Sequence, residues 1–518
     1  MAELLGSYIS GEWFTAHDAG VTVVDATTGE PVARVSSSGF DEQAIVDHAR
    51  AVGGPALRAL TFHERAAALR ALAAYLDSRK DAYYELSACT GATRRDSAVD
   101  VDGGIGTMFA FSGIGRRELP QARVLADGEP VSLGKQGAFA AQHVYTSLHG
   151  VVLQINAFNF PVWGMLEKLA PAVLAGVPSI VKPATQTAYL TAAVFRDIIE
   201  SGVLPEGSVQ LLCGGLGTLL DGLGGEDVIA FTGSAATAAQ LRNHDAVVRR
   251  AARFNAETDS LNACILGPDA TPSSEEFGLF VKEVTREMTV KAGQKCTAIR
   301  RALVPEALID DAVSALQERL AKVVVGNPRS DSTTMGALVS VQQRAEVRKA
   351  VQSLRNAAEI VSGDVNRVDV VDADPERGAF IAPILLLSDD VRRDEPHEVE
   401  AFGPVSTVMP YAGVDDVIAI AARGKGSLVG SIVSYDGEFI ERVVAGTAPH
   451  HGRLLILDRD CAAESTGHGT PMPQTVHGGP GRAGGGEELG GVRAVKHLMQ
   501  RTALQGSPSR LASLVGSS

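Results

Sequence analysis

Cysteine is scarce in this sequence and is not arranged in pairs. Five cysteines are spread over 518 residues, and no two of them form a C-x-x-C motif. Such spacing predicts neither a disulfide framework nor a zinc site, and the twelve histidines form no metal-ligand pattern. We therefore expect no bound metal, and a reducing cytoplasm is the expected location.

An excess of basic charge and a long apolar run are lacking as well. The chain has 47 lysines and arginines against 61 aspartates and glutamates, a formal net charge of −14. This balance argues against nucleic acid or an anionic membrane as a partner. The apolar stretch from Ala170 to Val181 is interrupted by Pro171, Gly176 and Pro178, and no basic segment followed by an apolar run opens the chain. Neither a membrane span nor an export signal is expected.

The length and the alternation of patterns predict an α/β protein with two large domains, or with one domain split by insertions. Between residues 150 and 235, short apolar runs alternate with helical stretches, which predicts a buried parallel sheet. A second alternating block covers residues 263–434, with a helix expected at 308–324, and residues 40–88 are expected to form a pair of surface helices. The expected elements of the first block are strands at 151–155, 179–181, 209–212 and 228–231 and helices at 166–174 and 187–201.

One cysteine lies in a setting that favours chemistry. Cys296 follows Gly293 and the two lysines Lys291 and Lys295. Positive neighbours lower the pKa of a thiol and so favour the nucleophilic thiolate. The alternative interpretation of a lone cysteine is a small buried apolar residue.

A glutamate and an asparagine are candidates for supporting roles. Glu257 follows an apolar segment near the expected domain junction and is a candidate general base, unless it is a surface or helix-start glutamate. Asn159 lies between an expected strand and an expected helix. Its amide can stabilise an oxyanion, or it can simply cap the helix.

Two strand ends are candidates for cofactor contacts. Lys182 lies at the exit of a buried strand, where open α/β sheets bind ligands. The Phe231-Thr232-Gly233-Ser234 turn leads from a strand into a helix, whose free N–H groups can meet phosphate. No G-x-G-x-x-G motif stands at a suitable strand exit, which argues against the usual dinucleotide-binding turn.

Taken together and in this order, these segments resemble the aldehyde dehydrogenase superfamily over nearly the whole chain. By this resemblance Cys296 is the nucleophile, Glu257 the general base and Asn159 an oxyanion donor, while Lys168 contacts the cofactor ribose or orders water. Lys182 and the Phe231–Ser234 turn would contact the cofactor, and Glu400 would hold the nicotinamide ribose. The matching motifs are Asn159-Phe160-Pro161, Phe231-Thr232-Gly233-Ser234, Gly293-Gln294-Lys295-Cys296 and Glu400-Ala401-Phe402-Gly403-Pro404.

The resemblance also implies a fold and an assembly. It implies a Rossmann-like cofactor domain over residues 1–255, an α/β catalytic domain over 256–455, and a return of residues 456–518 to the first domain. A hairpin at about 128–148 and a strand near Met499 would form a small oligomerisation arm. A homodimer would follow.

Departures from the family pattern bear on the substrate. Thr258-Asp259-Ser260 follows Glu257 where the family has Leu-Gly-Gly, and the segment from Pro471 to Arg482 replaces the common C-terminal loop. That loop resembles dehydrogenases of aerobic, CoA-dependent aromatic degradation, which oxidise semialdehydes carried as CoA thioesters. Some of these are fused to a hydratase domain, and the chain ends too early for one. The resemblance therefore implies a CoA-linked aldehyde of the benzoyl-CoA pathway.

The cofactor is expected to be NADP⁺ rather than NAD⁺. NAD-preferring relatives place a glutamate three residues after the lysine that aligns with Lys182, and this chain has Thr185 there. Without that carboxylate, a 2′-phosphate is not repelled. The remaining alternatives are a general aldehyde dehydrogenase, a CoA-acylating one, and a non-catalytic binding protein of the same fold.

Overall fold

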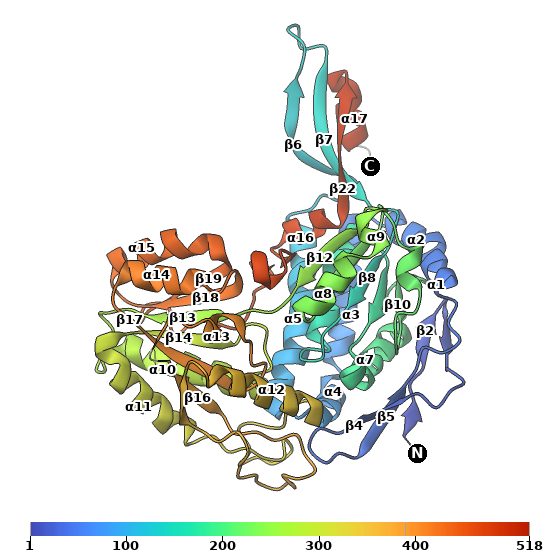
Figure 1. The fold of residues 1–518 in the computed structure, drawn as a ribbon. Helices are drawn as coiled ribbons and strands as arrows, with labels where there is room; N and C mark the ends of the chain where they lie inside the picture. The colour runs from blue at the N-terminus through green and yellow to red at the C-terminus, as the bar shows by residue number, and fades with distance from the viewer. Residues whose placement is uncertain (1, 389, 517–518) are drawn as a thin grey trace.

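The computed structural model describes residues 2–388 and 390–516. It contains two α/β bodies, each built on a seven-stranded sheet, and an arm that projects from one of them (Figure 1). The chain passes from the first sheet to the second between β12 (Arg253–Glu257) and β13 (Asn262–Leu266). Among the described residues, no helix has both the length and the apolar character needed to cross a bilayer.

The first sheet has a parallel core whose two faces are both covered. Alternate residues of its strands enter two different cores, so that Val152 packs on one side and Leu153 on the other. Burial on both faces explains the continuous apolar runs of the sequence, and the predicted strands are confirmed with ends that differ by a few residues. In spatial order the strands are β12, β11 (Val228–Thr232), β8 (Val152–Ile155), β9 (Ser179–Lys182), β10 (Val209–Leu211), and the antiparallel β2 (Ser7–Ile9) and β3 (Glu12–Phe14).

Helices connect and cover these strands. The two predicted helices of this block are confirmed as α6 (Trp163–Ala175) and α7 (Ala188–Glu200). Helix α6 ends at Gly176, which adopts a φ of 77° that favours glycine. The remaining helices of this half are α1 (Glu42–His48), α2 (Gly54–Ala59), α3 (Phe62–Asp77), α4 (Lys80–Ser87), α5 (Arg94–Arg117), α8 (Ala235–Arg242), α9 (Asp245–Val248) and α16 (Val492–His497).

The prediction of two surface helices over residues 40–88 is wrong. The segment forms α1 to α4, and α3 is packed into the main core with its Arg65 side chain fully buried. Charge at helical spacing indicates solvent exposure only when the charged group has no internal partner. Here the Arg65 guanidinium donates to the backbone carbonyls of Leu57, Leu60 and Leu174, so the residue bridges α3 and the end of α6.

The second sheet confirms the second alternating block. The predicted helix at 308–324 is shorter, as α11 (Ile309–Leu320), because Val324 donates its N–H to the Thr334 hydroxyl instead of continuing the helix. In spatial order the strands are β15 (Glu359–Ser362), β16 (Ile384–Leu387), β17 (Val405–Tyr411), β14 (Ile299–Pro305), β13, β18 (Ser427–Val433) and β19 (His451–Leu457). Its other helices are α10 (Glu275–Thr289), α12 (Val341–Leu354), α13 (Glu395–Glu398), α14 (Val414–Ala422) and α15 (Gly437–Thr447).

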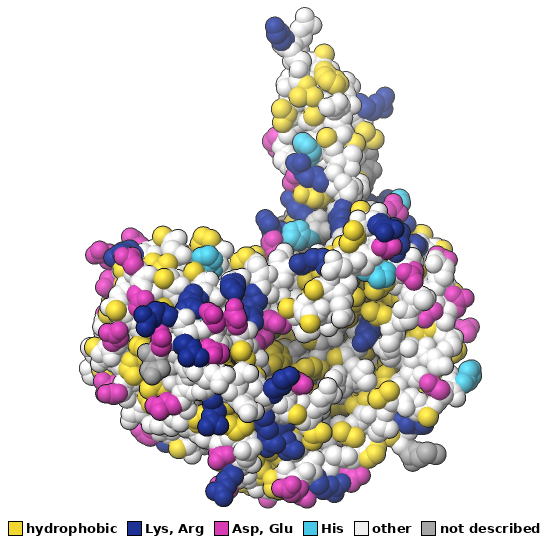
Figure 2. Space-filling view, in the orientation of Figure 1, with side chains coloured by type: hydrophobic (Ala, Val, Ile, Leu, Met, Phe, Trp, Pro, Cys, Tyr) yellow, Lys and Arg dark blue, Asp and Glu magenta, His cyan; other side chains and the backbone are white. Residues whose placement is uncertain are grey.

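The arm is a three-stranded antiparallel sheet that stands away from both bodies (Figure 1). It consists of β6 (Leu125–Ser132), β7 (Ala140–Ser147) and β22 (Met499–Gly506), and α17 (Pro508–Gly516) packs against it. The strand predicted near Met499 is thus confirmed. Hydrophobic side chains are visible on the arm surface (Figure 2), and Val131, Leu133 and Phe139 are each close to half exposed or more.

Two small sheets complete the fold. One lies near the N-terminus and consists of β1 (Glu3–Leu4), β4 (Val21–Val24) and β5 (Pro31–Val35). The other is the hairpin of β20 (Val476–Gly478) and β21 (Glu487–Leu489), which lies next to β12. The hairpin brings the C-terminal part of the chain back to the edge of the first sheet.

Candidate active site

Two cavities meet at Cys296. The larger is a groove with an empty volume of about 1900 Å³, lined by the ends of β9, β11 and β12 on one side and by α12 and residues 398–402 on the other. The smaller has an empty volume of about 740 Å³. Both cavities are lined by Ala157, Asn159, Thr232, Glu257 and Cys296. The candidate nucleophile, base and oxyanion donor therefore lie together where two separate ligands can meet.

Seven of the residues predicted to contact a cofactor line the larger groove, whereas Lys168 does not. They come from the strand ends of the first sheet and from the segment after α13. The seven are Lys182, Thr185, Phe231, Gly233, Ser234, Glu400 and Phe402. Burial lowers the pKa of the Lys182 ammonium, which makes it a less hydrated donor for a polar ligand group.

Glu400 provides a test of whether this groove fits a dinucleotide. Its Oε1 atom is buried and has no hydrogen-bond partner among the described residues; Arg300 Nε lies 3.8 Å from it. Burial raises the pKa of Glu400 to about 7, against the opposing charge of Arg300. A buried acceptor that faces the groove is suited to bind ligand hydroxyls, such as those of a ribose. The residues present therefore fit such a cofactor.

The expectation of free N–H groups at the start of α8 is wrong for two of them. The Ser234 hydroxyl caps the helix by accepting from Thr237 N–H at 3.2 Å. The Asp259 carboxylate accepts from Ala235 N–H at 2.9 Å. Aspartate and serine are preferred partners of helix starts because their oxygens satisfy N–H groups that lack an internal acceptor. The unusual segment after Glu257 thus places a negative charge beside the groove.

The backbone before Cys296 is tightly turned. The 3₁₀ turn Val290–Gly293 contains Lys291, Ala292 and Gly293 with φ values of 52°, 50° and 66°. A side chain at Gly293 would lie 2.2 Å from the Gly403 carbonyl oxygen, so only glycine fits there. The Asn262 amide then donates to the Cys296 carbonyl at 2.8 Å. These contacts fix the position of the thiol.

Lys295 lowers the pKa of this thiol, as the sequence predicted, but burial and nearby carboxylates outweigh it. The Lys295 ammonium lies 2.6 Å from the Glu287 carboxylate, and the Lys291 ammonium lies over the Phe160 ring at 4.9 Å from its centre. Burial and the neighbouring Glu257 carboxylate raise the Cys296 pKa well above its usual value. The thiol is therefore protonated at rest, and a base must remove its proton.

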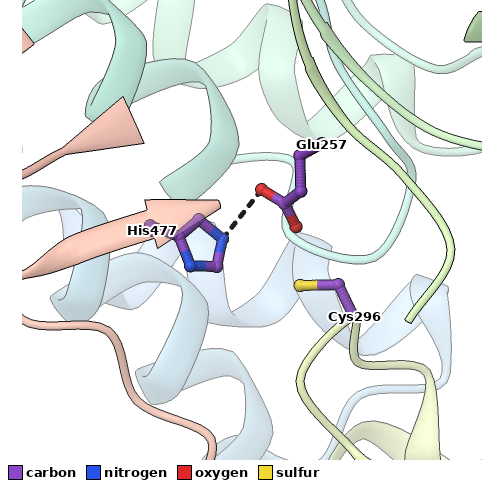
Figure 3. Close-up of side chains that lie close together, drawn as sticks. All are labelled: Glu257, Cys296 and His477. Atoms are coloured by element: carbon purple, nitrogen blue, oxygen red, sulfur yellow. Dashed lines mark ion pairs between the residues drawn. The ribbon is translucent and has the colours of Figure 1, made fainter. Parts of the chain in front are cut away.

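Glu257 is the last residue of β12 and is buried, so the surface and helix-start alternatives are wrong. Its carboxylate lies 2.8 Å from His477 Nε2, and both side chains point toward the Cys296 thiol (Figure 3). Burial favours the neutral form of both groups, but their mutual attraction prevails. It lowers the Glu257 pKa to about 2 and raises the His477 pKa to about 9.

His477 was missed as a functional residue at the level of sequence. The unusual loop that carries it was noted, but its distance along the chain from Glu257 gave no reason to pair the two. Glu257, Cys296 and His477 each have one side-chain atom that could bind a metal ion, and these three atoms lie within 4.8 Å of one another. That spacing would also suit a metal ion, but the 2.8 Å contact already balances the charges of Glu257 and His477. We interpret the group as an ion pair beside a thiol.

Asn159 does not cap the following helix. The N–H groups of Val162 and Trp163 donate instead to the buried Asp100 carboxylate, at 3.2 and 2.8 Å. The capping alternative is therefore wrong, and the buried Asn159 side chain lines both cavities.

Lys168 is in a different position from the other predicted site residues. It lines neither of the two cavities, and its ammonium lies 3.1 Å from Glu488 and 3.5 Å from Glu167. Burial opposes its charge, but these carboxylates and Glu257 raise its pKa. Lys168 thus belongs to a buried charged cluster behind Glu257.

The smaller cavity combines apolar walls with two arginines. Phe160, Trp163 and Val290 line it, as do the exposed Arg95 and the half-buried Arg286. Arg286 lies 3.7 Å from Glu283, whereas no ion pair of Arg95 is found among the described residues. The cavity is therefore suited to an apolar chain that also carries negative charge.

Comparison with known proteins decides the family. The model of the aldehyde dehydrogenase family matches residues 13–501. The chain belongs to the aldehyde dehydrogenase family. The 3,4-dehydroadipyl-CoA semialdehyde dehydrogenase of Aromatoleum evansii is 46% identical to this aldehyde dehydrogenase over 478 residues, which cover 92% of this chain and 93% of the relative.

Solved structures show the same fold. Lactaldehyde dehydrogenase from Escherichia coli superposes with a TM-score of 0.84 at 22% identity, covering 98% of this chain and 99% of the other. Betaine aldehyde dehydrogenase from Staphylococcus aureus in complex with NAD⁺ gives 0.83 at 24% identity, covering 97% and 94%. The predicted aldehyde dehydrogenase fold is confirmed. This protein is an NAD(P)-dependent aldehyde dehydrogenase, and the alternative of a non-catalytic binding protein is dropped.

Proposed function

We propose that this aldehyde dehydrogenase uses NADP⁺ to oxidise a CoA-linked semialdehyde, 3,4-dehydroadipyl-CoA semialdehyde, to the carboxylic acid. The observation that carries the proposal is the position of Cys296 between a groove that fits a dinucleotide and a smaller cavity with apolar walls and two arginines. The name of the relative from Aromatoleum evansii supports the substrate and a place in aromatic degradation by the benzoyl-CoA pathway.

The reaction begins with the Cys296 thiol. Glu257 is the carboxylate beside it, with its oxygen within 4.8 Å of the sulfur, so Glu257 takes the thiol proton as sulfur attacks the aldehyde carbon. The Asn159 amide and the Cys296 N–H stabilise the oxyanion that forms. When bound, the nicotinamide supplies the hydride acceptor. The acyl group then remains on Cys296 as a thioester.

Water, rather than free CoA, resolves the thioester. Glu257 lies next to the sulfur and is ionised, so it can accept a proton from an attacking water. This arrangement favours the acid as product over the CoA-acylating alternative. A general aldehyde dehydrogenase remains the second candidate, favoured by the apolar part of the smaller cavity.

The substrate assignment predicts a preference that kinetics can measure. The catalytic efficiency with a CoA-linked semialdehyde is expected to exceed that with the free-acid analogue and with simple aldehydes, because Arg95 and Arg286 can meet the negative charges of the CoA moiety. Initial rates of nicotinamide reduction with each aldehyde test this. Equal or better rates with simple aldehydes would leave only a general aldehyde dehydrogenase.

A variant of Arg95 can distinguish the contribution of this arginine to substrate binding from a general loss of folding or activity. Arg95→Ala should raise KM for the CoA-linked aldehyde by about tenfold, as for the loss of one charge-assisted contact, and leave kcat with a simple aldehyde unchanged. Arg94 is the matched control, because it is a neighbouring exposed arginine that pairs with Asp81 and does not line the cavity.

The NADP⁺ preference rests on the region around Thr185. Thr185 lines the cofactor groove and also an adjoining hollow that contains Ser36, Ser37 and one carboxylate, Asp18. Hydroxyl groups and the Lys182 ammonium can accommodate a 2′-phosphate, whereas a carboxylate would repel it.

Thr185→Glu is expected to reverse the cofactor preference. The new carboxylate should lower kcat/KM for NADP⁺ by about 10- to 100-fold and raise that for NAD⁺, since it repels phosphate and accepts hydrogen bonds from ribose hydroxyls. Parallel rates with both cofactors provide the measurement. Thr185→Gln, which has the same size without charge, should not acquire the NAD⁺ preference. A wild-type enzyme more efficient with NAD⁺ would refute the proposal.

The assembly and the domain assignment complete the proposal. The half-exposed Val131, Leu133 and Phe139 on the arm favour a homodimer in which the arm is covered by a second copy. The domains are proposed as a cofactor-binding unit over residues 1–255, a catalytic unit over 256–455, and the return segment 456–518.

A further inference from the structure

We propose that His477 and Glu257 act as one acid–base pair in the hydrolysis of the thioester, with His477 as a positioning residue that acts through the Glu257 carboxylate. The inference rests on the proposed function, since it assumes an acyl group on Cys296. The two side chains lie 2.8 Å apart, both are buried, and both face the thiol (Figure 3).

The local fold holds this pair in place. His477 lies in β20, and the glycine-rich segment after it runs against β12. Thr258 N–H donates to the Ala483 carbonyl at 3.0 Å, and Gly486 N–H donates to the Ala256 carbonyl at 3.1 Å. A side chain at Gly486 would lie 2.3 Å from the Ala256 oxygen, so glycine permits this close approach. The segment is thus attached to β12 on both sides of Glu257.

The basicity of Glu257 depends on whether His477 carries a proton. The charge of protonated His477 holds the Glu257 pKa near 2, and such a carboxylate is a weak base for water, because general bases work best with a pKa close to the working pH. With a neutral His477, the pair can gain one proton at a pKa of about 9. The deprotonated pair is therefore the stronger base.

Other charged groups also face the pair and contribute to its titration. They come from α6, from β21 and from the turn before β14, and they remain unchanged when His477 is replaced. These groups are Glu167, Lys168, Glu488 and Cys296.

The proposed step balances in atoms and charge. A water oxygen attacks the thioester carbon while one water proton passes to Glu257, whose gain of a proton is stabilised by the neutral His477 imidazole. The C–S bond then breaks, the acid leaves, and the proton returns to the Cys296 sulfur. The raised pKa of Cys296 favours that last transfer.

His477→Gln tests the inference because glutamine retains a hydrogen-bond donor but does not titrate. The wild-type and variant enzymes are mixed with the CoA-linked semialdehyde and NADP⁺, and the burst of nicotinamide reduction is recorded together with the later steady rate. Burst amplitude counts the sites that form the thioester, and so separates misfolding from slow hydrolysis. His497→Gln is the control, since His497 lies near a carboxylate, Glu487, but outside the two active-site cavities.

The expected result is a difference that grows with pH. The bursts should be similar, and the steady rate of the variant should fall about tenfold or more below wild type at about pH 9. The difference should be smaller at about pH 7, where the wild-type His477 is protonated and does not assist Glu257. The wild-type rate alone should rise with pH up to about 9. A constant ratio at every pH would overturn the inference. Absence of a burst in wild type would mean that hydrolysis does not limit turnover, and would overturn the inference. Failure of wild type to oxidise the CoA-linked semialdehyde at all would refute the proposed function.

Discussion

Replacement of Cys296 by serine is expected to lower kcat by about 10⁴-fold or more, with no burst of nicotinamide reduction. The hydroxyl is a far weaker nucleophile than a thiolate, and no neighbouring lysine is free to activate it, because Lys295 is paired with Glu287. Stopped-flow measurement of the first turnover, with cofactor and CoA-linked aldehyde present, provides the test.

Another thiol supplies the control for this variant. Cys461→Ser removes a partly buried cysteine that lines neither active-site cavity, so its kinetics should match wild type. A thiol-alkylating reagent should likewise stop activity by labelling Cys296, but slowly, because the raised pKa keeps this thiol protonated at rest. Substantial turnover by Cys296→Ser would remove the thioester from the mechanism.

Much of the fold could be predicted because its main signals are local. The strands of the first sheet are buried on both faces, and burial of that kind appears in the sequence as continuous apolar runs such as Val228 to Phe231. The burial of Arg65 was not predicted, because its hydrogen-bond partners are the backbone carbonyls of Leu57, Leu60 and Leu174. Backbone partners cannot be recognised from the pattern of side chains in a sequence.

The candidate site was predicted in part for the same reason. Cys296, Glu257 and Asn159 each follow or precede a recognisable element, and the ends of neighbouring strands meet at one edge of a sheet. The electrostatics could not be predicted, because they depend on pairings between distant segments. Glu287 neutralises Lys295 from the preceding helix, and His477 reaches Glu257 from a hairpin near the C-terminus.

The Cys296 thiol is therefore activated in a different way from the one that the sequence predicted. Neighbouring positive charge would have produced a resting thiolate, which is open to oxidation and alkylation. Burial and Glu257 instead keep the Cys296 thiol protonated until a base acts. In the mechanism that we propose, the Glu257–His477 pair then controls reactivity, rather than the lysines next to Cys296 in sequence.

Glu257→Gln is expected to lower the steady-state rate by between about 10² and 10⁴-fold, the range for loss of a general base. The amide has nearly the same size but cannot take a proton from the thiol or from water. His477 also loses the largest of the charges that raise its pKa, so burial should then favour its neutral form.

The variant is therefore expected to fold, and its chemistry can be followed directly. Any thioester that forms should persist on Cys296 long enough for intact-protein mass spectrometry to detect it. Glu276→Gln is a matched control, since it removes a buried carboxylate from the ion pair with Arg459, outside both active-site cavities. Near-normal turnover by Glu257→Gln would exclude Glu257 as the base, and would transfer that role to another group in reach of the thioester, of which the His477 imidazole is the first to test.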